Sequence, residues 1–222
     1  MEQQSQVATQ STDRCPLCAA AALEAFAEDK RRPYLRCCHC ALVSVPRAWH
    51  LSAAQEKAEY DKHQNDPFDP GYRRFLSRAF APLADQLPAG AQGLDFGCGP
   101  GPALCHMARE RGLQMANYDL YYYPDRELLN CQYDFVVLTE VIEHIAQPAQ
   151  LLQELATLLK PGAILALMTK RVIDRHAFQR WHYKNDPTHI CFYALETFEW
   201  LAQRYGWQLQ VVDADVVFLR AP

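Results

Sequence analysis

The sequence predicts an α/β protein with a doubly wound, mostly parallel sheet and a small cysteine-rich module at its N-terminus. Short apolar stretches alternate with amphipathic helical stretches from residue 91 onward, and a glycine-rich loop follows the first apolar stretch. Strands that alternate with helices are typical of parallel sheets with helices on both faces. Two Cys-x-x-Cys pairs near the N-terminus indicate a separate module.

The chain divides by composition into four predicted segments. These are a polar, disordered tail at 1–13, the cysteine module at 14–47, a helical cap or linker at 48–90, and the α/β domain at 91–222. In the cap, a helix over 52–64 begins at Ser52, which is a favourable N-cap residue. A turn-rich break separates it from a second helix over 72–86.

Turn and capping residues delimit the elements of the α/β domain. Its helices are expected to end at Gly112, at the Lys-Pro-Gly sequence of 160–162, and at Gly206. They cover 103–111, 148–159 and 195–205. The expected strands are 93–97, 113–118, 133–139, 163–169, 207–213 and 215–220, and the last two favour a hairpin.

The charge and apolar patterns exclude several classes of protein. With 22 basic and 26 acidic residues, the net charge is −4, so the whole protein has no basic field for a nucleic-acid backbone. The apolar stretches are too short for a membrane span, and the N-terminus lacks the apolar core of a signal peptide. The nine cysteines are odd in number, which favours a reducing, cytoplasmic location.

The cysteine module has the ligand pattern of a structural zinc ribbon. Cys15 and Cys18 form one pair, and Cys37 and Cys40 form another pair 18 residues later. Four thiolates at this spacing bind Zn²⁺ tetrahedrally, and so small a module needs the metal to fold. Cys38 is a spare thiol. Redox-active pairs are the alternative, but their usual strand–helix–strand context is missing.

The glycine loop predicts a site for a nucleoside-containing ligand. Asp95 and Phe96 end the first strand, and Gly97 and Gly99 follow in the loop. Alternate glycines let the backbone approach a ligand closely, and the next helix begins with free N–H groups. Asp119 ends the second strand, where a carboxylate can bind both ribose hydroxyls. The glycine spacing differs from that of dinucleotide-binding oxidoreductases.

A cluster of acidic residues and histidines follows the strand at 133–139. Glu140, Glu143 and His144 have the spacing of one helical face, and His189 lies in the long loop of 170–190. Two carboxylates and two imidazoles make a candidate site for one divalent cation. Oxygen ligands suit Mg²⁺ or Mn²⁺, whereas imidazole favours Mn²⁺, Fe²⁺ or Zn²⁺. A solvated helix face is the alternative.

These motifs resemble those of class I S-adenosylmethionine (SAM)-dependent methyltransferases. DFGCGPG, YDL, YDFVVLTEVIEH and LLKPGAILALMT occur in the family's order and spacing over 91–222. The resemblance implies a Rossmann-like fold and SAM as cofactor. It places Gly97 and Gly99 at the methionine part of SAM, Asp119 at the ribose and Leu120 at the adenine, with Asp95 and Phe96 nearby. The cap residues implied at this pocket are Tyr60, His63, Asn65, Tyr72 and Arg73.

The Glu-x-x-Glu-His motif with a later histidine is similar to two methyltransferase groups. These are the ubiquinone-biosynthesis O-methyltransferases and the small-RNA 3′-terminal 2′-O-methyltransferases. The resemblance implies a metal on neighbouring hydroxyls, held by Glu140, Glu143, His144 and His189. Without a metal, the same residues are candidate catalytic bases. Over its whole length, the chain resembles bacterial proteins that join a zinc ribbon to such a methyltransferase domain.

We therefore expect O-methylation of a small hydroxylated molecule. The alternatives are an RNA methyltransferase that uses the ribbon for substrate delivery and a non-enzymatic SAM-binding scaffold; the ribbon is also a candidate site for a protein partner. The segment 175–184 is dense in aromatic and basic residues. Such a segment can stack on a flat substrate or pack the loop onto the protein.

Overall fold

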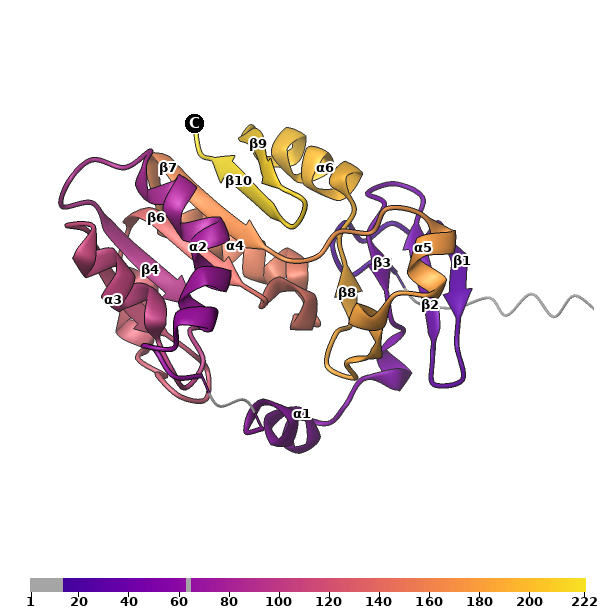
Figure 1. Cartoon of the computed structure of the whole chain (residues 1–222). Helices are drawn as coiled ribbons and strands as arrows, with labels where there is room; N and C mark the ends of the chain where they lie inside the picture. The colour runs from indigo at the N-terminus through magenta and orange to yellow at the C-terminus, as the bar shows by residue number, and fades with distance from the viewer. Residues whose placement is uncertain (1–13, 63–64) are drawn as a thin grey trace, which may run out of the picture.

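The computed structural model describes residues 14–62 and 65–222, and the expected tail lies outside this range. Its main sheet has the strand order β5-β4-β6-β7-β10-β9 (Figure 1). β10 is antiparallel to both of its neighbours, whereas β5, β4, β6 and β7 are mutually parallel. The strands are β4 Gln92–Phe96, β5 Gln114–Tyr118, β6 Tyr133–Thr139, β7 Leu159–Met168, β9 Gln208–Asp213 and β10 Val216–Arg220. The predicted doubly wound sheet and the final hairpin are confirmed.

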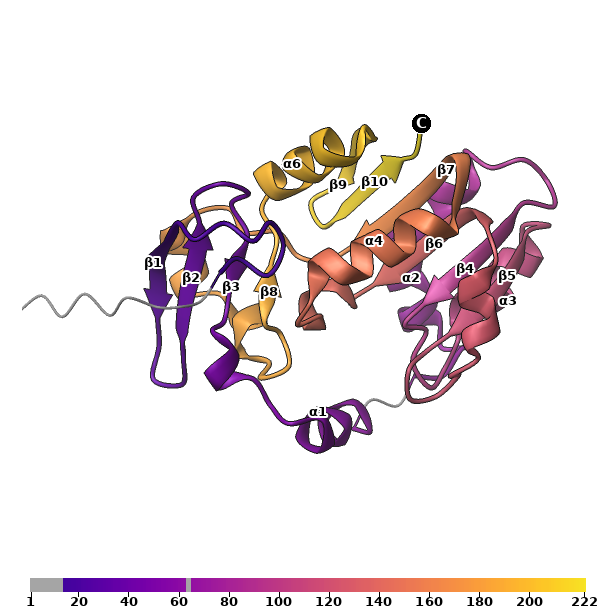
Figure 2. The same ribbon diagram turned by 180° about the vertical axis from the view of Figure 1, so that it is seen from behind.

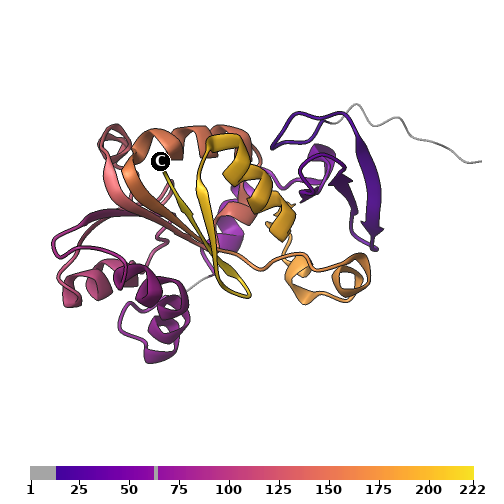
Figure 3. The ribbon, with the colours of Figure 1, turned by 90° about the horizontal axis from the view of Figure 1, so that it is seen from above.

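Helices cover both faces of this sheet (Figure 3). Alternate residues of β6 belong to two different core clusters: Phe135 and Val137 pack with helices α2 and α3, while Val136 and Leu138 pack with α4 and α6. These helices are α2 Pro70–Ala84, α3 Ala103–Glu110, α4 Pro148–Leu158 and α6 Leu195–Tyr205. A strand that is buried on both faces is apolar throughout, as the sequence of β6 shows.

The predicted helix boundaries agree with the structure to within about two residues at most ends. Ser52 caps α1 (Ala53–Tyr60) through a reciprocal capping box with Gln55. Gly206 ends α6 in the left-handed conformation, with φ 69°. No helix in the described ranges 14–62 and 65–222 has the length and apolar character that a membrane span requires.

The cysteine module shares a second sheet with the α/β domain. Its order is β1-β2-β3-β8 (Figure 2), with β1 Leu23–Glu28, β2 Pro33–Cys37, β3 Val43–Ser44 and β8 Cys191–Phe192. Because β8 comes from the long loop after β7, the ribbon pairs with the domain and is not a free appendage. Ribbon side chains also belong to the same core cluster as α4 and α6.

The aromatic segment packs against the ribbon. It contains α5 (Arg175–Gln179), and the ring of Phe178 meets those of Tyr34 and Phe192 edge to face, at centroid distances of 5.0 and 5.2 Å. The ring of Trp181 also contacts Phe178 in a tilted arrangement, at a centroid distance of 5.8 Å. Of the two alternatives for this segment, packing of the loop is therefore the one that the structure has. Short 3-10 turns complete the fold, at Arg47–Trp49, Arg126–Asn130, Ile142–His144 and His182–Asn185.

Gly93 tests how tightly β4 and β6 pack. A Cβ atom at this position would lie 2.2 Å from the Phe135 ring, so Gly93→Ala should lower the free energy of unfolding by about 1–3 kcal/mol. Urea denaturation measures this loss. In Gly93→Ala combined with Phe135→Leu, the total loss should be smaller than the sum of the single losses, because the clash is relieved. Full additivity would contradict this packing.

Candidate active site

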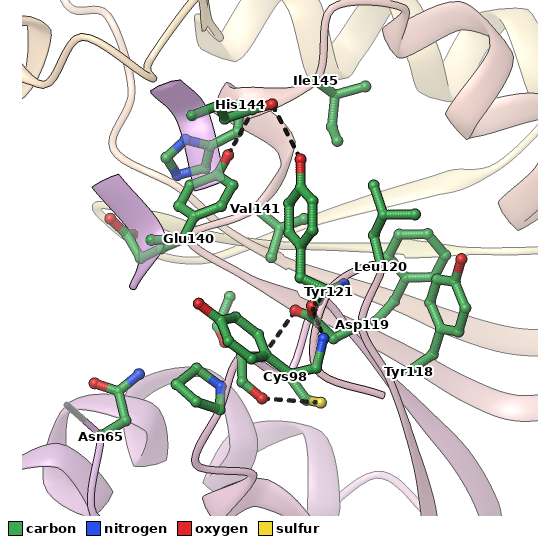
Figure 4. Close-up of a pocket in the computed structure, with 18 of the residues that line it drawn as sticks. Asn65, Cys98, Tyr118, Asp119, Leu120, Tyr121, Glu140, Val141, His144 and Ile145 are labelled. Atoms are coloured by element: carbon green, nitrogen blue, oxygen red, sulfur yellow. Dashed lines mark hydrogen bonds between the residues drawn. The ribbon is translucent and has the colours of Figure 1, made fainter. Parts of the chain in front are cut away.

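The candidate active site is a cavity of about 570 Å³ at the carboxyl edge of the main sheet (Figure 4). It lies where the loops after β4, β5 and β6 meet, which is the switch point at which doubly wound sheets bind ligands. Residues of α1, of α2 and of the long loop complete its wall. The cavity therefore joins the glycine loop to the acidic–histidine cluster.

The glycine loop is anchored to the end of β5. The N–H groups of Gly97 and Cys98 donate to the carbonyl of Tyr118, at 2.7 and 3.2 Å. Gly97 and Gly99 have φ values of 81° and 63°, which residues other than glycine rarely adopt. A Cβ atom on Gly97 would also lie 2.6 Å from the Val141 side chain. The loop thus needs glycine for both its conformation and its packing.

Asp119 holds this loop in place and lines the cavity. One carboxylate oxygen accepts from the Gly99 N–H at 3.0 Å, and the other accepts from the N–H groups of Tyr121 and Tyr122 at 2.8 and 3.1 Å. Leu120, next to it, is 61% exposed and also lines the cavity. The ribose contact of Asp119 and the adenine contact of Leu120 stay predictions.

Asp95 and Phe96 lie at the base of the glycine loop. The Phe96 ring lines the cavity, and its centroid is 5.0 Å from that of Tyr118. Asp95 is buried and is not among the described lining residues. Burial and the charge of Asp119 raise the pKa of Asp95 to about 7. Asp95 therefore lies behind the cavity wall, and its predicted role in cofactor binding stays a prediction.

The prediction that Glu140, Glu143 and His144 lie on one helical face is wrong. Glu140 has a left-handed backbone, with φ 54°, and its N–H donates to the Met168 carbonyl at the end of β7. Ile142–His144 form a 3-10 turn, and α4 begins only at Pro148. Glu140 and Glu143 therefore do not share a helical face. A left-handed acidic residue at such a site is a strained arrangement that surrounding contacts must maintain.

The long loop nevertheless brings His189 to this turn. Glu143, His144 and His189 each offer one ligand atom, and these atoms all lie within 4.8 Å of one another. The rings of His144 and His189 are 4.6 Å apart at their centroids. Glu140 lies outside this group and accepts a 3.0 Å hydrogen bond from the Tyr183 hydroxyl. Glu140, His144 and His189 line the cavity.

Burial perturbs the ionisation of these groups. Burial and the neighbouring charge of Glu143 raise the pKa of Glu140 to about 8, and burial raises the pKa of Glu143 to about 7. Burial and the charge of His144 lower the pKa of His189 to about 4. The Nδ1 atom of His189 lies 2.8 Å from the Tyr183 carbonyl, which assigns it the proton. His189 is thus a neutral imidazole with its basic nitrogen, Nε2, unprotonated.

The cap contributes part of the cavity wall, as expected. Tyr60, Asn65 and Tyr72 line it, whereas His63 lies outside the described residues. Arg73 instead pairs with Glu110. The sequence reasoning missed Glu56, Asp186 and the tyrosines that follow β5. The run of tyrosines at 121–123 was a visible signal for an aromatic wall.

The four predicted zinc ligands form one cluster. Their sulfur atoms lie within 4.8 Å of one another; Cys15 and Cys40 are 3.5 Å apart, and Cys18 and Cys37 are 3.4 Å apart. Tetrahedral zinc with sulfur at about 2.3 Å requires sulfur separations of about 3.8 Å, so the residues fit this ion. Cys38 is exposed and is not part of the cluster.

The switch-point cavity, the glycine loop and the acidic residue after β5 define a class I SAM-dependent methyltransferase. The model of the methyltransferase domain family matches residues 68–212, more than half of the chain, and the chain therefore belongs to this family. No curated protein sequence matches the chain significantly.

Solved methyltransferases share the fold at low identity. The calicheamicin-biosynthesis methyltransferase CalO1, with S-adenosylhomocysteine (SAH) bound, is 14% identical, with a TM-score of 0.51 over 77% of this chain and 58% of that one. A Thermotoga maritima SAM-dependent methyltransferase is 19% identical, with a TM-score of 0.39 over 69% of this chain and 95% of that one. At 14% identity, the likeness to CalO1 concerns the fold alone.

Asp95 predicts a pH dependence of stability. Its pKa rises from 3.8 to about 7 on folding, so its contribution to the free energy of unfolding falls as pH rises through this window. The stability of Asp95→Asn relative to the wild type should therefore rise by about 1.4 kcal/mol per pH unit between pH 5 and pH 7 and level off above pH 7. Urea denaturation at several pH values measures this.

Asp134→Asn is the matched control. The Gln92 N–H and Lys160 lower the pKa of Asp134, so this carboxylate stays ionised in both states above pH 5. Its stability difference from the wild type should be flat from pH 5 to 8. A flat profile for Asp95→Asn as well would contradict the assigned burial of that carboxyl.

Proposed function

We propose that the protein transfers a methyl group from SAM to a hydroxyl oxygen of a small molecule. One observation carries this proposal: a single cavity has the glycine loop and Asp119 on one wall and Glu140, His144 and His189 on another. The first wall suits a nucleoside cofactor, and the second suits proton removal. The resemblance to ubiquinone-biosynthesis O-methyltransferases points to the same class of substrate.

The residues at the glycine loop fit SAM. The left-handed glycines bring the loop backbone to the cavity wall, Asp119 offers carboxylate oxygens for ribose hydroxyls, and Leu120 offers an apolar surface for adenine. SAM supplies a methyl group that its sulfonium already activates. The protein must therefore orient the acceptor oxygen and help to remove its proton.

His189 is the candidate base that the geometry favours most. Its Nδ1 proton is held by the Tyr183 carbonyl, so Nε2 is available to accept a proton from a substrate hydroxyl. His144 lies beside it, and Glu140 lines the same wall. Tyrosine rings of the cap, of the end of β5 and of the segment after β5 exclude water and offer surfaces for a flat substrate. They are Tyr60, Tyr72, Tyr118, Tyr121 and Tyr122.

Glu143, His144 and His189 also fit a divalent cation. Their ligand atoms converge, and one Glu143 carboxylate oxygen is buried without a hydrogen-bond partner in the described structure. Two imidazoles favour Mn²⁺, Fe²⁺ or Zn²⁺ over Mg²⁺. A bound cation would lower the pKa of a coordinated hydroxyl. Glu140 would act from outside this ligand set. The Tyr183 hydroxyl lies within hydrogen-bonding distance of the carboxylates of both Glu140 and Glu143 and so connects the two residues.

The ribbon is proposed to hold one structural zinc. Purified protein should contain about one zinc per chain, because four converging thiolates make a closed tetrahedral site. Cys15→Ser or Cys40→Ser should lose the metal and lower the melting temperature. Cys38→Ser is the matched control and should keep the zinc, because Cys38 is exposed and outside the cluster. Metal-free protein, purified under reducing conditions without chelator, would refute the site.

Methyl transfer is tested with SAM and a panel of catechols and other small hydroxylated compounds, followed by SAH release. His189→Asn should lower kcat about 100-fold or more and leave SAH affinity unchanged. Asp119→Ala should weaken SAH binding about 10- to 100-fold in calorimetry, because it removes a buried acceptor. His182→Asn is a control in the same loop, since His182 is exposed and outside the cavity wall.

The same assay separates the remaining alternatives. Loss of activity on chelation, with the ribbon zinc retained and activity restored by Mn²⁺ or Fe²⁺, would support a catalytic cation at this site. Unchanged activity would instead support proton removal by a side-chain base without a metal. Methylation of RNA but of no small molecule would favour ribbon-delivered RNA as substrate. SAH binding without transfer to any acceptor would favour a scaffold.

A further inference from the structure

A buried arginine of the ribbon holds the loop that carries His189. Arg32 is only 6% exposed, although it is charged. Its guanidinium donates hydrogen bonds to the main-chain carbonyls of four loop residues, at distances of 2.8 to 3.0 Å. These residues are Lys184, Asp186, Pro187 and His189. A fork of N–H donors that spans four carbonyls fixes the path of a loop with little regular structure.

A second set of contacts joins the turn between β1 and β2 to the same loop. The Lys184 ammonium, itself buried, donates to Asp29 at 2.6 Å, and the Tyr34 hydroxyl donates to the same carboxylate oxygen at 3.0 Å. The N–H groups of Arg31 and Arg32 donate to the other oxygen of Asp29. These bonds and the ammonium lower the pKa of Asp29 well below its usual range. An ion pair and several hydrogen bonds therefore fix the turn before β2 and bind it to the loop.

Main-chain hydrogen bonds connect the ribbon to the turn that holds Glu143 and His144. The Val45 N–H, just after β3, donates to the Ile190 carbonyl at 2.9 Å, and the Ile190 N–H donates to the Glu143 carbonyl at 2.9 Å. The residue next to His189 thus bridges the ribbon and the turn that holds Glu143 and His144. Ribbon, His189 and Glu143 form one hydrogen-bonded unit.

The cysteine cluster anchors both ribbon segments that contact the loop, namely the turn that carries Arg32 and the strand β3. β2 begins directly after Arg32 and ends at Cys37, and β3 begins shortly after Cys40. The cofactor wall is held differently: the glycine loop is hydrogen-bonded to Tyr118 and Asp119, and among the described residues no hydrogen bond joins this loop to the ribbon. Damage to the ribbon should therefore move His189 and leave the SAM wall in place.

We propose that the ribbon is the positioning device of the active site: Arg32 and β3 hold His189 against His144 and Glu143, so that zinc loading of the ribbon governs methyl transfer and not cofactor binding. The part that concerns methyl transfer rests on the proposed function; the part that concerns the loop does not. Arg32 acts through His189 and is a positioning residue. An intact ribbon is then a condition for catalysis in the full chain.

The test compares Arg32→Gln with Arg36→Gln. Arg36 lies on β2, which begins directly after Arg32, but it makes exposed ion pairs with Glu24 and Glu196. In Arg32→Gln, amide hydrogen exchange in peptides covering 184–193 should speed up at least tenfold, while the zinc content and SAH affinity stay at wild-type values. The value of kcat should fall at least tenfold with an unchanged KM for SAM. Arg36→Gln should match the wild type in every measurement.

Two further arms exclude a merely structural effect. Adding Arg32→Gln to His189→Asn should lower kcat no further, because the arginine acts through that histidine. Removal of the ribbon zinc by a chelator should speed exchange in the same peptides with SAH binding retained. Arg32→Lys keeps the charge and provides a milder variant if the glutamine protein does not fold; it should give an intermediate rise in exchange.

Unchanged exchange at 184–193 in both Arg32 variants would overturn the proposal. So would a loss of kcat that adds fully to that of His189→Asn, or a parallel loss of SAH binding. Exchange and SAH affinity require no acceptor substrate. If the wild type methylates nothing in the panel, the proposed function fails, and the exchange arms still decide whether the ribbon positions the loop.

Discussion

The parallel pairing of β4 with β5 on one side and with β6 on the other is the constraint on which the site depends. Parallel strands end at one edge, so the loop after Phe96, the carboxylate of Asp119 and the turn at Glu140 meet there. The same closeness explains Gly97, because the Val141 side chain that follows β6 occupies the space of its absent Cβ. Fold and cavity follow from one arrangement.

Acidic groups are buried at this edge, and their surroundings decide their charge. Glu140 and Glu143 hold their protons to a higher pH than usual because burial disfavours the charged form. The Tyr183 hydroxyl lies within hydrogen-bonding distance of both. Tyr183 belongs to the segment that packs on the ribbon. The charges of these carboxyls therefore depend on a loop that packs on a module distant in sequence.

The sequence predicted most of what rests on local patterns. The bounds of β6 and α6 agree with the structure, because an apolar run and a terminal glycine signal them directly. The helical face predicted for Glu140, Glu143 and His144 is wrong, since the spacing pattern took no account of the hydrogen bond from the Glu140 N–H to the Met168 carbonyl at the end of β7. The pairing of β3 with β8 carried no sequence signal, because both strands are only two residues long.

The sequence by itself determined the fold class, the glycine loop with its acidic partner Asp119, and the four-cysteine cluster. Each of these depends on residues close together in the chain or on a fixed spacing. Only the tertiary structure decided that His189 joins His144 and Glu143, that Glu140 stands apart, and that Arg32 holds the loop between them. These contacts join residues more than 40 positions apart, and their partners are main-chain carbonyls and buried side chains that no local pattern encodes.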